Sequence, residues 1–219
     1  MSHFASYDRT LGRLAVIGAS TPLTEIATRV RACRGCPLGS QRTNAVPGEG
    51  SSEARIIFVG EAPGFHEDQQ GRPFVGQAGK LLDELLAAAG LHRNQVFIAN
   101  ILKCRPPSNR DPLPAEIDAC SGHLAAQIEA LDPAVIVTLG RYSLQRFLPG
   151  ATISRVHGQK FTKDGRTIVP MYHPAAALHQ GSLRAVIEDD FRKLPGYLAD
   201  PEPEPEPAAA PAVAQGRLL

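Results

Sequence analysis

Four cysteines are the residues of this chain whose type and spacing point most directly to chemistry. They are all the cysteines among its 219 residues, and they form two pairs: Cys33 with Cys36, and Cys104 with Cys120. Four thiolates suit either one tetrahedral zinc ion or a four-iron, four-sulfur cluster. Two disulfides are the alternative, but they would need an oxidising compartment. Three charged residues among the first 13 positions interrupt any secretory signal, so we predict a metal centre held by all four thiols.

The remaining sequence predicts the elements that must position these thiols. Short apolar runs alternate with amphipathic segments, which predicts strands at 55–60, 96–102, 134–140 and 167–171, and helices at 23–31, 79–89, 114–131, 141–147 and 182–198. Such alternation is typical of a parallel sheet with helices on both faces. The nearly continuous apolar character of the strands indicates burial on both sides. We therefore predict a three-layer α/β/α fold around a central, mostly parallel four-stranded sheet.

The chain divides by composition into an N-terminal extension (1–21), one domain (22–199) and a tail rich in proline, glutamate and alanine (200–219). Without the tail, 22 basic residues stand against 18 acidic ones, a net charge of +4. This weak positive charge is compatible with a polyanionic partner. No run approaches the roughly 20 apolar residues of a membrane span. We expect a cytoplasmic monomer without membrane association.

Polar residues follow the carboxyl ends of the predicted strands, where parallel sheets bind their ligands. Glu61 follows the first strand, Asn100 lies near the end of the second, and His173 follows the fourth. Each has a structural alternative, because a glycine-rich loop can simply turn the chain, and a buried amide or imidazole can simply satisfy neighbouring backbone groups. The loop after the first strand matches neither the dinucleotide fingerprint nor the P-loop. A carboxylate, an amide and an imidazole are thus expected in one crevice.

Three longer motifs surround these residues, at 60–64 with 67–68 and 71–76, at Asn100 with 103–110, and at 173–176. Over residues 22–198 their order and spacing resemble the iron–sulfur, family 4 uracil-DNA glycosylases. The four cysteines stand where that family ligates a [4Fe-4S] cluster, with zinc as the alternative. The resemblance implies a uracil-DNA glycosylase-like fold and hydrolysis of the N-glycosidic bond of uracil in DNA. The products would be free uracil and an abasic site, as in base excision repair.

The resemblance also implies catalytic roles for three residues. Glu61 would orient the attacking water and favour the cationic sugar. His173 would stabilise the negative charge that develops on the departing uracil. Asn100 would bind the base, because its carbonyl can accept from N3–H while its amide donates to O4, and cytosine presents the opposite pattern at both atoms.

Three further residues are implied in substrate binding. The flipped uracil would stack on Phe74, for which core packing is the alternative role. Glu67 would lie beside C5 of the base, where the methyl group of thymine would clash. Ala62 would contribute its backbone amide. One departure stands at His179, where the family often has an arginine, on the loop expected to press into DNA.

Two other segments suggest contacts with partners. Basic residues near the cysteines (Arg34, Lys103, Arg105 and Arg110) could present a positive rim to phosphates, or could merely offset the charge of the cluster. The final residues Gln215–Leu219 resemble short peptides that bind the bacterial sliding clamp, and they predict a nucleoid-associated protein. A non-catalytic iron–sulfur module that binds nucleic acid is the alternative function.

Overall fold

The computed structural model describes residues 22–199. The predicted N-terminal extension (1–21) and tail (200–219) lie outside these residues, so the division into three parts stays a prediction. None of the helices within 22–199 is both long enough and apolar enough to cross a membrane.

A single mixed sheet forms the centre of the domain, with the strand order β1-β3-β2-β4-β6-β5. Its strands are β1 (Glu49–Gly50), β2 (Ile56–Gly60), β3 (Phe97–Asn100), β4 (Val135–Leu139), β5 (Phe161–Lys163) and β6 (Arg166–Met171). The inner strands β3, β2, β4 and β6 are parallel, and they are the four strands that the sequence predicts. The outer strands β1 and β5 pair antiparallel and were not predicted. At two and three residues they are too short to show an alternating pattern.

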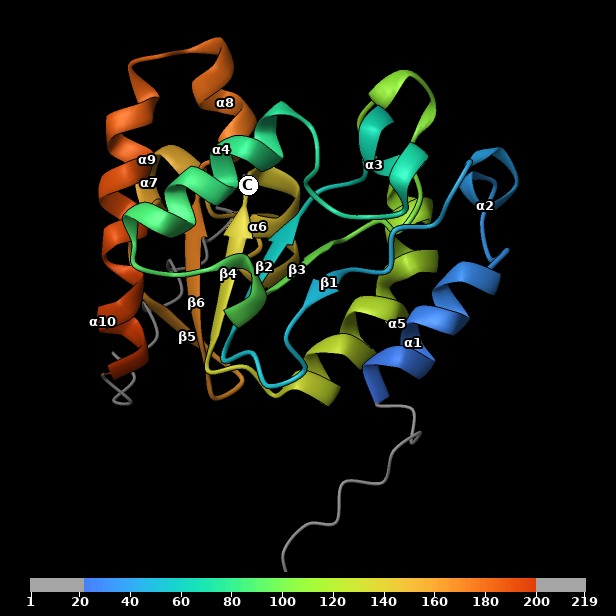
Figure 1. Ribbon diagram of the computed structural model, residues 1–219, viewed down its shortest axis with the longest axis horizontal. Coiled ribbons are helices and arrows are strands. Elements are labelled where there is room, and N and C mark those ends of the chain that lie inside the picture. Colours follow the sequence, from blue (N-terminus) through green and yellow to red (C-terminus); the bar gives the residue numbers. More distant parts are fainter. Residues whose placement is uncertain (1–21, 200–219) are drawn as a thin grey trace, which may run out of the picture.

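Helices lie on both faces of this sheet, which gives three layers (Figure 1). They are α1 (Pro22–Ala32), α2 (Leu38–Gln41), α3 (Phe65–Gln70), α4 (Gln77–Ala88), α5 (Pro114–Leu131), α6 (Arg141–Phe147), α7 (Ile153–Val156), α8 (Pro174–His179), α9 (Leu183–Arg192) and α10 (Leu194–Ala199). Single 3₁₀ turns occur at η1 (Arg93–Gln95) and η2 (Pro107–Asn109). The α/β fold class predicted from the sequence is confirmed.

Alternate side chains of the inner strands build two separate hydrophobic cores, because successive residues of a strand point to opposite faces. In β2, Ile56 and Phe58 pack with the leucines of α4 and with Phe191 of α9. Ile57 and Val59 instead pack with α5, α6 and the start of α1. Every residue of β2 is buried, which explains why this strand is apolar without interruption.

The register of the parallel strands brings their carboxyl ends to one edge of the sheet. Gly60 of β2 pairs with Asn100 of β3. On the other side, the backbone amide of Gly140, after β4, donates to the carbonyl of Met171 in β6 at 2.9 Å. The loops that follow these strands therefore meet above this edge.

Candidate active site and cysteine cavity

An open cavity of about 850 Å³ lies at the carboxyl edge of the sheet. The loop after β2, the end of β3 and the start of α8 contribute to its walls. All six residues proposed from the sequence for catalysis or base binding line it: Glu61, Ala62, Glu67, Phe74, Asn100 and His173. The structure thus brings together side chains that are as far as 112 positions apart in the sequence.

Asn100 presents an unpaired acceptor at the wall of this cavity. The residue is 2% exposed, and its carbonyl oxygen Oδ1 is buried without a hydrogen-bond partner among the described residues. A buried polar atom without a partner is costly, so this oxygen is suited to accept from a ligand. Gly60 makes room for it, because a Cβ at Gly60 would lie 2.3 Å from Oδ1 and 2.7 Å from Cζ of Phe74.

His173 is a neutral imidazole whose proton position is fixed by the backbone. Its Nδ1 accepts from the amide of Ala175 at 3.1 Å, at the N-terminus of α8. Burial of the ring lowers the pKa of His173 to about 4, and the nearby Glu67 offsets this only in part. The single proton of the ring therefore resides on Nε2 at neutral pH, which makes Nε2–H a donor. Gly140 (φ 88°) permits the close approach, since a Cβ there would lie 3.2 Å from Cβ of His173.

Phe74 belongs both to the cavity wall and to the hydrophobic core. Its ring stacks on His173, with 5.5 Å between the centroids and 26° between the planes, and the residue is only 6% exposed. The core-packing alternative therefore describes most of this side chain. Its backbone has φ 51°, a conformation uncommon outside glycine that often occurs at functional sites. Arg93 stabilises it by donating to the carbonyls of Phe74, at 3.2 Å, and of Pro73.

The carboxylate of Glu67 joins the loop before α3 to the segment that follows Phe74. One oxygen accepts from the amides of Val75 at 2.8 Å and Gly76 at 2.9 Å, and the other accepts from the amide of Gly64 at 3.1 Å. The sequence predicted only a contact of Glu67 with the substrate and did not reveal these three backbone hydrogen bonds. The backbone amide of Ala62 has no hydrogen-bond partner within the described part of the chain and is available to a ligand.

Glu61 is half-buried in the same cavity, beside an ion pair that the sequence did not reveal. Burial raises the pKa of Glu61; the negative charge of Asp111 raises it further, and Arg141 lowers it. Asp111 and Arg141 pair with each other at 2.5 Å between Oδ2 and Nη2, and both line the cavity. Glu61 therefore gains a proton more readily than an exposed glutamate does.

The four cysteines line a second cavity, between the α1–α2 region and α5. All four are free thiols. Three of the sulfurs accept N–H donors: Cys104 from Arg42 at 2.9 Å, Cys120 from the amide of Lys103 at 3.3 Å, and Cys33 from the amide of Gly35 at 3.4 Å.

Burial raises the pKa of the Cys120 thiol to about 11; the neighbouring thiols of Cys104 and Cys36 act in the same direction, and Lys103 acts against them. The four cysteines fit a metal group that binds thiolates, because the positive charge of the metal would offset the cost of burying the thiolates. Within residues 22–199, no three histidine, cysteine, aspartate or glutamate side chains are placed to hold a single metal ion.

Comparison with known proteins shows the family to which this chain belongs. The model of the uracil DNA glycosylase superfamily matches residues 47–194. A type-4 uracil-DNA glycosylase of Archaeoglobus fulgidus is 48% identical over 181 residues, which cover 78% of this chain and 91% of that protein. The chain belongs to this type-4 family.

Two other type-4 uracil-DNA glycosylases are similar over a comparable length. The protein of Sulfurisphaera tokodaii is 50% identical over 78% of this chain and 83% of its own. That of Thermotoga maritima is 45% identical over 79% of this chain and 93% of its own. The resemblance stated from the sequence motifs is confirmed.

One expectation about the basic residues of this type-4 family member is wrong. Lys103 cannot contribute to a positive rim because it is 1% exposed. Its ammonium instead donates to the backbone carbonyl of Asn100 at 2.8 Å and to Oε1 of Gln127 at 2.6 Å. Arg110 forms a bidentate ion pair with Glu116, at 2.6 and 2.9 Å. From the sequence a lysine beside a cysteine is expected at the surface. Only the packing shows that Lys103 is buried and binds the backbone carbonyl of Asn100.

Proposed function

We propose that this protein hydrolyses the N-glycosidic bond between uracil and deoxyribose in DNA, which leaves an abasic site for base excision repair. The observation that carries the proposal is the cavity at the carboxyl edge of the sheet, where Asn100 Oδ1 lacks a partner within residues 22–199 and His173 offers a donor. The names of the relatives, type-4 uracil-DNA glycosylases, support the same activity.

Base recognition is assigned to Asn100. A base inside a duplex is out of reach, so the nucleotide must rotate into the cavity. The unpaired Oδ1 would then accept from N3–H of uracil, and the amide of Asn100 would donate to O4. Cytosine carries an acceptor at N3 and a donor at C4, so it would oppose both contacts. Lys103 keeps the backbone of Asn100 in place from beneath.

Bond cleavage is assigned to His173 and Glu61. Negative charge develops on uracil as the bond breaks, and Nε2–H of the neutral His173 would donate to O2 of the departing base. A donor placed in this way contributes about 10²–10³ in rate. The carboxylate of Glu61 would orient the water and favour positive charge on the sugar. The Asp111–Arg141 pair beside it tunes how readily that carboxylate takes a proton.

The remaining lining residues would shape the cavity around the base. Phe74 would offer the exposed part of its ring for stacking, which is worth about 1–3 kcal/mol per base. Glu67 would lie beside C5 of uracil, leaving no space for the methyl group of thymine. The free amide of Ala62 would donate to the base.

We propose further that Cys33, Cys36, Cys104 and Cys120 hold a [4Fe-4S] cluster. The common cavity and the N–H donors on three sulfurs support this. Glycosidic hydrolysis transfers no electrons, so the cluster would join the α1–α2 region to α5 and to the segment that carries Lys103. Purified protein should be brown and absorb near roughly 400 nm, whereas a zinc protein would be colourless.

The predicted clamp-binding motif, Gln215–Leu219, lies outside the described residues and stays a prediction, as do the monomeric state and association with the nucleoid. A peptide of residues 210–219 should bind the sliding clamp, and changing Leu218 and Leu219 to alanine should abolish the binding. No binding by the unchanged peptide would end this idea.

One assay tests the proposed activity. A labelled oligonucleotide with a single uracil is incubated with cluster-loaded protein, and abasic sites are cleaved with alkali. Strand cleavage at the uracil position is expected. Intact strands, together with binding to the same DNA, would favour the alternative of a non-catalytic nucleic-acid-binding module.

A further inference from the structure

A polar groove of about 690 Å³ lies beside the cysteine cavity, separate from the candidate active site. It is lined by the end of α1, the α2 region and the residues that follow α3. Four arginines contribute to its lining: Arg31, Arg34, Arg42 and Arg72. None of the described residues that line it is acidic, so the groove has the charge that a polyanion requires.

Two of these arginines make neither an ion pair with a carboxylate nor a hydrogen bond to another side chain within the described chain. Arg72 is paired with Glu49, with N–O distances of 2.6 and 2.8 Å, and Arg42 is occupied by Cys104 and the carbonyl of Arg31. Arg34 bonds only the carbonyl of Cys33, at 3.0 Å. The side chain of Arg31 makes no hydrogen bond or ion pair in residues 22–199, and both Arg31 and Arg34 are exposed. These two guanidinium groups are free to bind an anion.

The groove lies within a few nucleotides of the candidate active site. Helix α3 joins them, since Gly64 and Glu67 at its beginning line the active-site cavity while Gln70 at its end lines the groove. A helix of six residues is about 9 Å long at 1.5 Å per residue. In Figure 1, α3 and α2 both lie in the upper right part of the domain.

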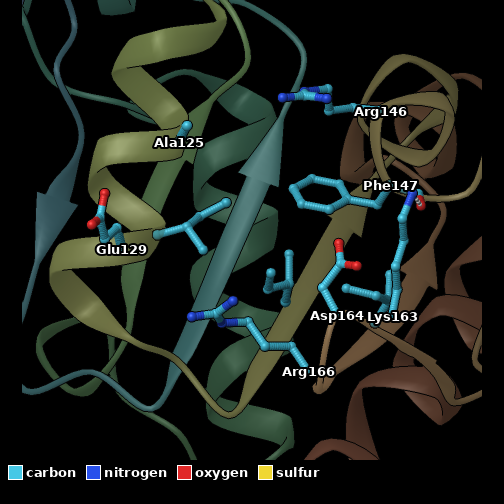
Figure 2. A pocket seen from close by; sticks show the side chains of 10 residues that line it. Ala125, Glu129, Arg146, Phe147, Lys163, Asp164 and Arg166 are labelled. Carbon is cyan, nitrogen blue, oxygen red and sulfur yellow. Dashed lines mark hydrogen bonds between the residues drawn. The ribbon is translucent and has the colours of Figure 1, made fainter.

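A second hollow with basic side chains serves as a contrast. This hollow, of about 330 Å³, is bounded by α5 and the β5–β6 hairpin, as Figure 2 shows. Arg146, Lys163 and Arg166 line it, but so do Glu129 and Asp164. Its charges are mixed and its floor includes isoleucines. The arginine groove differs by having cations alone.

We propose that the arginine groove binds the sugar–phosphate backbone of the DNA strand that carries the uracil, beside the flipped nucleotide, through Arg31 and Arg34. The proposal rests on the proposed function, because it names a second contact for the same substrate. Guanidinium groups bind phosphate oxygens with two N–H donors at once, and such contacts fix the register of DNA without reading its sequence. The groove would thereby hold the strand while the base enters the cavity.

The salt dependence of DNA binding tests this proposal. Cluster-loaded wild type, Arg31→Gln, Arg34→Gln and the double variant are titrated with a fluorescent oligonucleotide that carries a stable abasic-site analogue. Each lost phosphate contact should reduce the slope of log K against log salt concentration by about 0.7 on single strands or 0.9 on duplex. The double variant should therefore lose about 1.4–1.8, which weakens binding about fivefold to eightfold per contact at ~0.1 M salt.

Charge-conserving and distant variants control the experiment. Arg31→Lys with Arg34→Lys should keep most of the slope, and Arg146→Gln, in the hollow of Figure 2, should keep all of it. Absorbance near roughly 400 nm reports whether the cluster remains. Should the Arg34 variant lose that absorbance, Arg31→Gln alone decides the question, because its side chain bonds no described residue.

An unchanged salt slope in cluster-loaded Arg31→Gln would overturn the proposal. So would an equal loss of slope in Arg146→Gln, because the effect would then follow net charge rather than the groove. Excision of uracil by the wild type tests the proposed function independently, so the failure of one idea is distinguishable from the failure of the other.

Discussion

Gly60→Ala should damage base recognition while leaving the fold intact. A Cβ at this position would lie 2.3 Å from Oδ1 of Asn100 and 2.7 Å from the Phe74 ring. Real Cβ contacts essentially never fall below 3.0 Å, so Oδ1 must move by at least 0.7 Å, the difference between these two distances. By the same limit the Phe74 ring must move by 0.3 Å, from 2.7 to 3.0 Å. Because this ring belongs to a close-packed core, we expect Asn100 to take up most of the displacement.

The displacement sets the size of the effect. A hydrogen bond of about 2.9 Å would lengthen to about 3.6 Å or more, beyond the range in which it counts as one. Losing one partner of a buried polar contact costs about 1–3 kcal/mol, which corresponds to a fall in kcat/KM of roughly fivefold to 150-fold. Steady-state excision from a uracil-containing oligonucleotide measures kcat/KM. Thermal unfolding measures the accompanying loss of stability, which overpacking puts at about 1–3 kcal/mol.

Gly122→Ala is the matched control, because a Cβ there meets no atom within 4 Å. Gly122 lies inside α5, where alanine is favoured over glycine by roughly 0.5–1 kcal/mol. The control should be as stable as the wild type or slightly more so, with unchanged kcat/KM. If Gly60→Ala kept full activity in a folded, cluster-loaded protein, the proposed contact between Asn100 and the base would be refuted.

Four other variants or conditions test the remaining parts of the site. His173→Ala should lower the single-turnover excision rate about 10²–10³-fold with little change in affinity for an abasic analogue; equal losses of rate and affinity would point to misfolding. The wild-type rate should fall as pH falls through the raised pKa of Glu61, whose carboxylate form is required. The pKa of His173 is about 4, so the pH–rate profile should show no further change near the ordinary pKa of a histidine. Excision rates measured between about pH 4 and pH 9 check both statements. Glu61→Gln should remove the fall in rate at acidic pH. Cys120→Ser should abolish absorbance near roughly 400 nm and lower the melting temperature. Glu67→Gln should lower the free energy of unfolding by about 1–3 kcal/mol, because an amide group cannot accept all three backbone donors. An unchanged melting temperature would show that these hydrogen bonds to Glu67 do not stabilise the fold.

The strands and helices that position the site were largely predictable. The elements that the sequence did not predict are short segments without a periodic apolar pattern. The inner strands are apolar throughout because both of their faces are buried, so they stand out in the sequence. By contrast, α3 (Phe65–Gln70) has no apolar periodicity, and it is stabilised at its start by Glu67 accepting from the Gly64 amide. The predicted helix at 182–198 is divided at Lys193 into α9 and α10. Pro195, the second residue of α10, explains the break, because proline is tolerated in the first turn of a helix but not in its interior.

Six of the residues that line the cavity were selected from the sequence, but the contacts among the lining residues were not. The rule that ligands bind at strand carboxyl ends, together with the motif resemblance, selected residues that do line one cavity. Contacts between distant segments left no trace in the sequence. Arg93 supports the strained backbone of Phe74 across 19 positions, and Lys103 with Gln127 forms a buried pair beneath Asn100. These contacts depend on packing, which local patterns do not encode.

The central claim is that one cavity, with Asn100 and His173 in its wall, selects uracil and releases it. Three oligonucleotides that differ only in a single uracil, cytosine or thymine test it most directly, with the free base quantified by chromatography after incubation with cluster-loaded protein. We predict free uracil, one per strand, and neither cytosine nor thymine. Uracil strands that stay intact, or cytosine released at a comparable rate, would contradict the account.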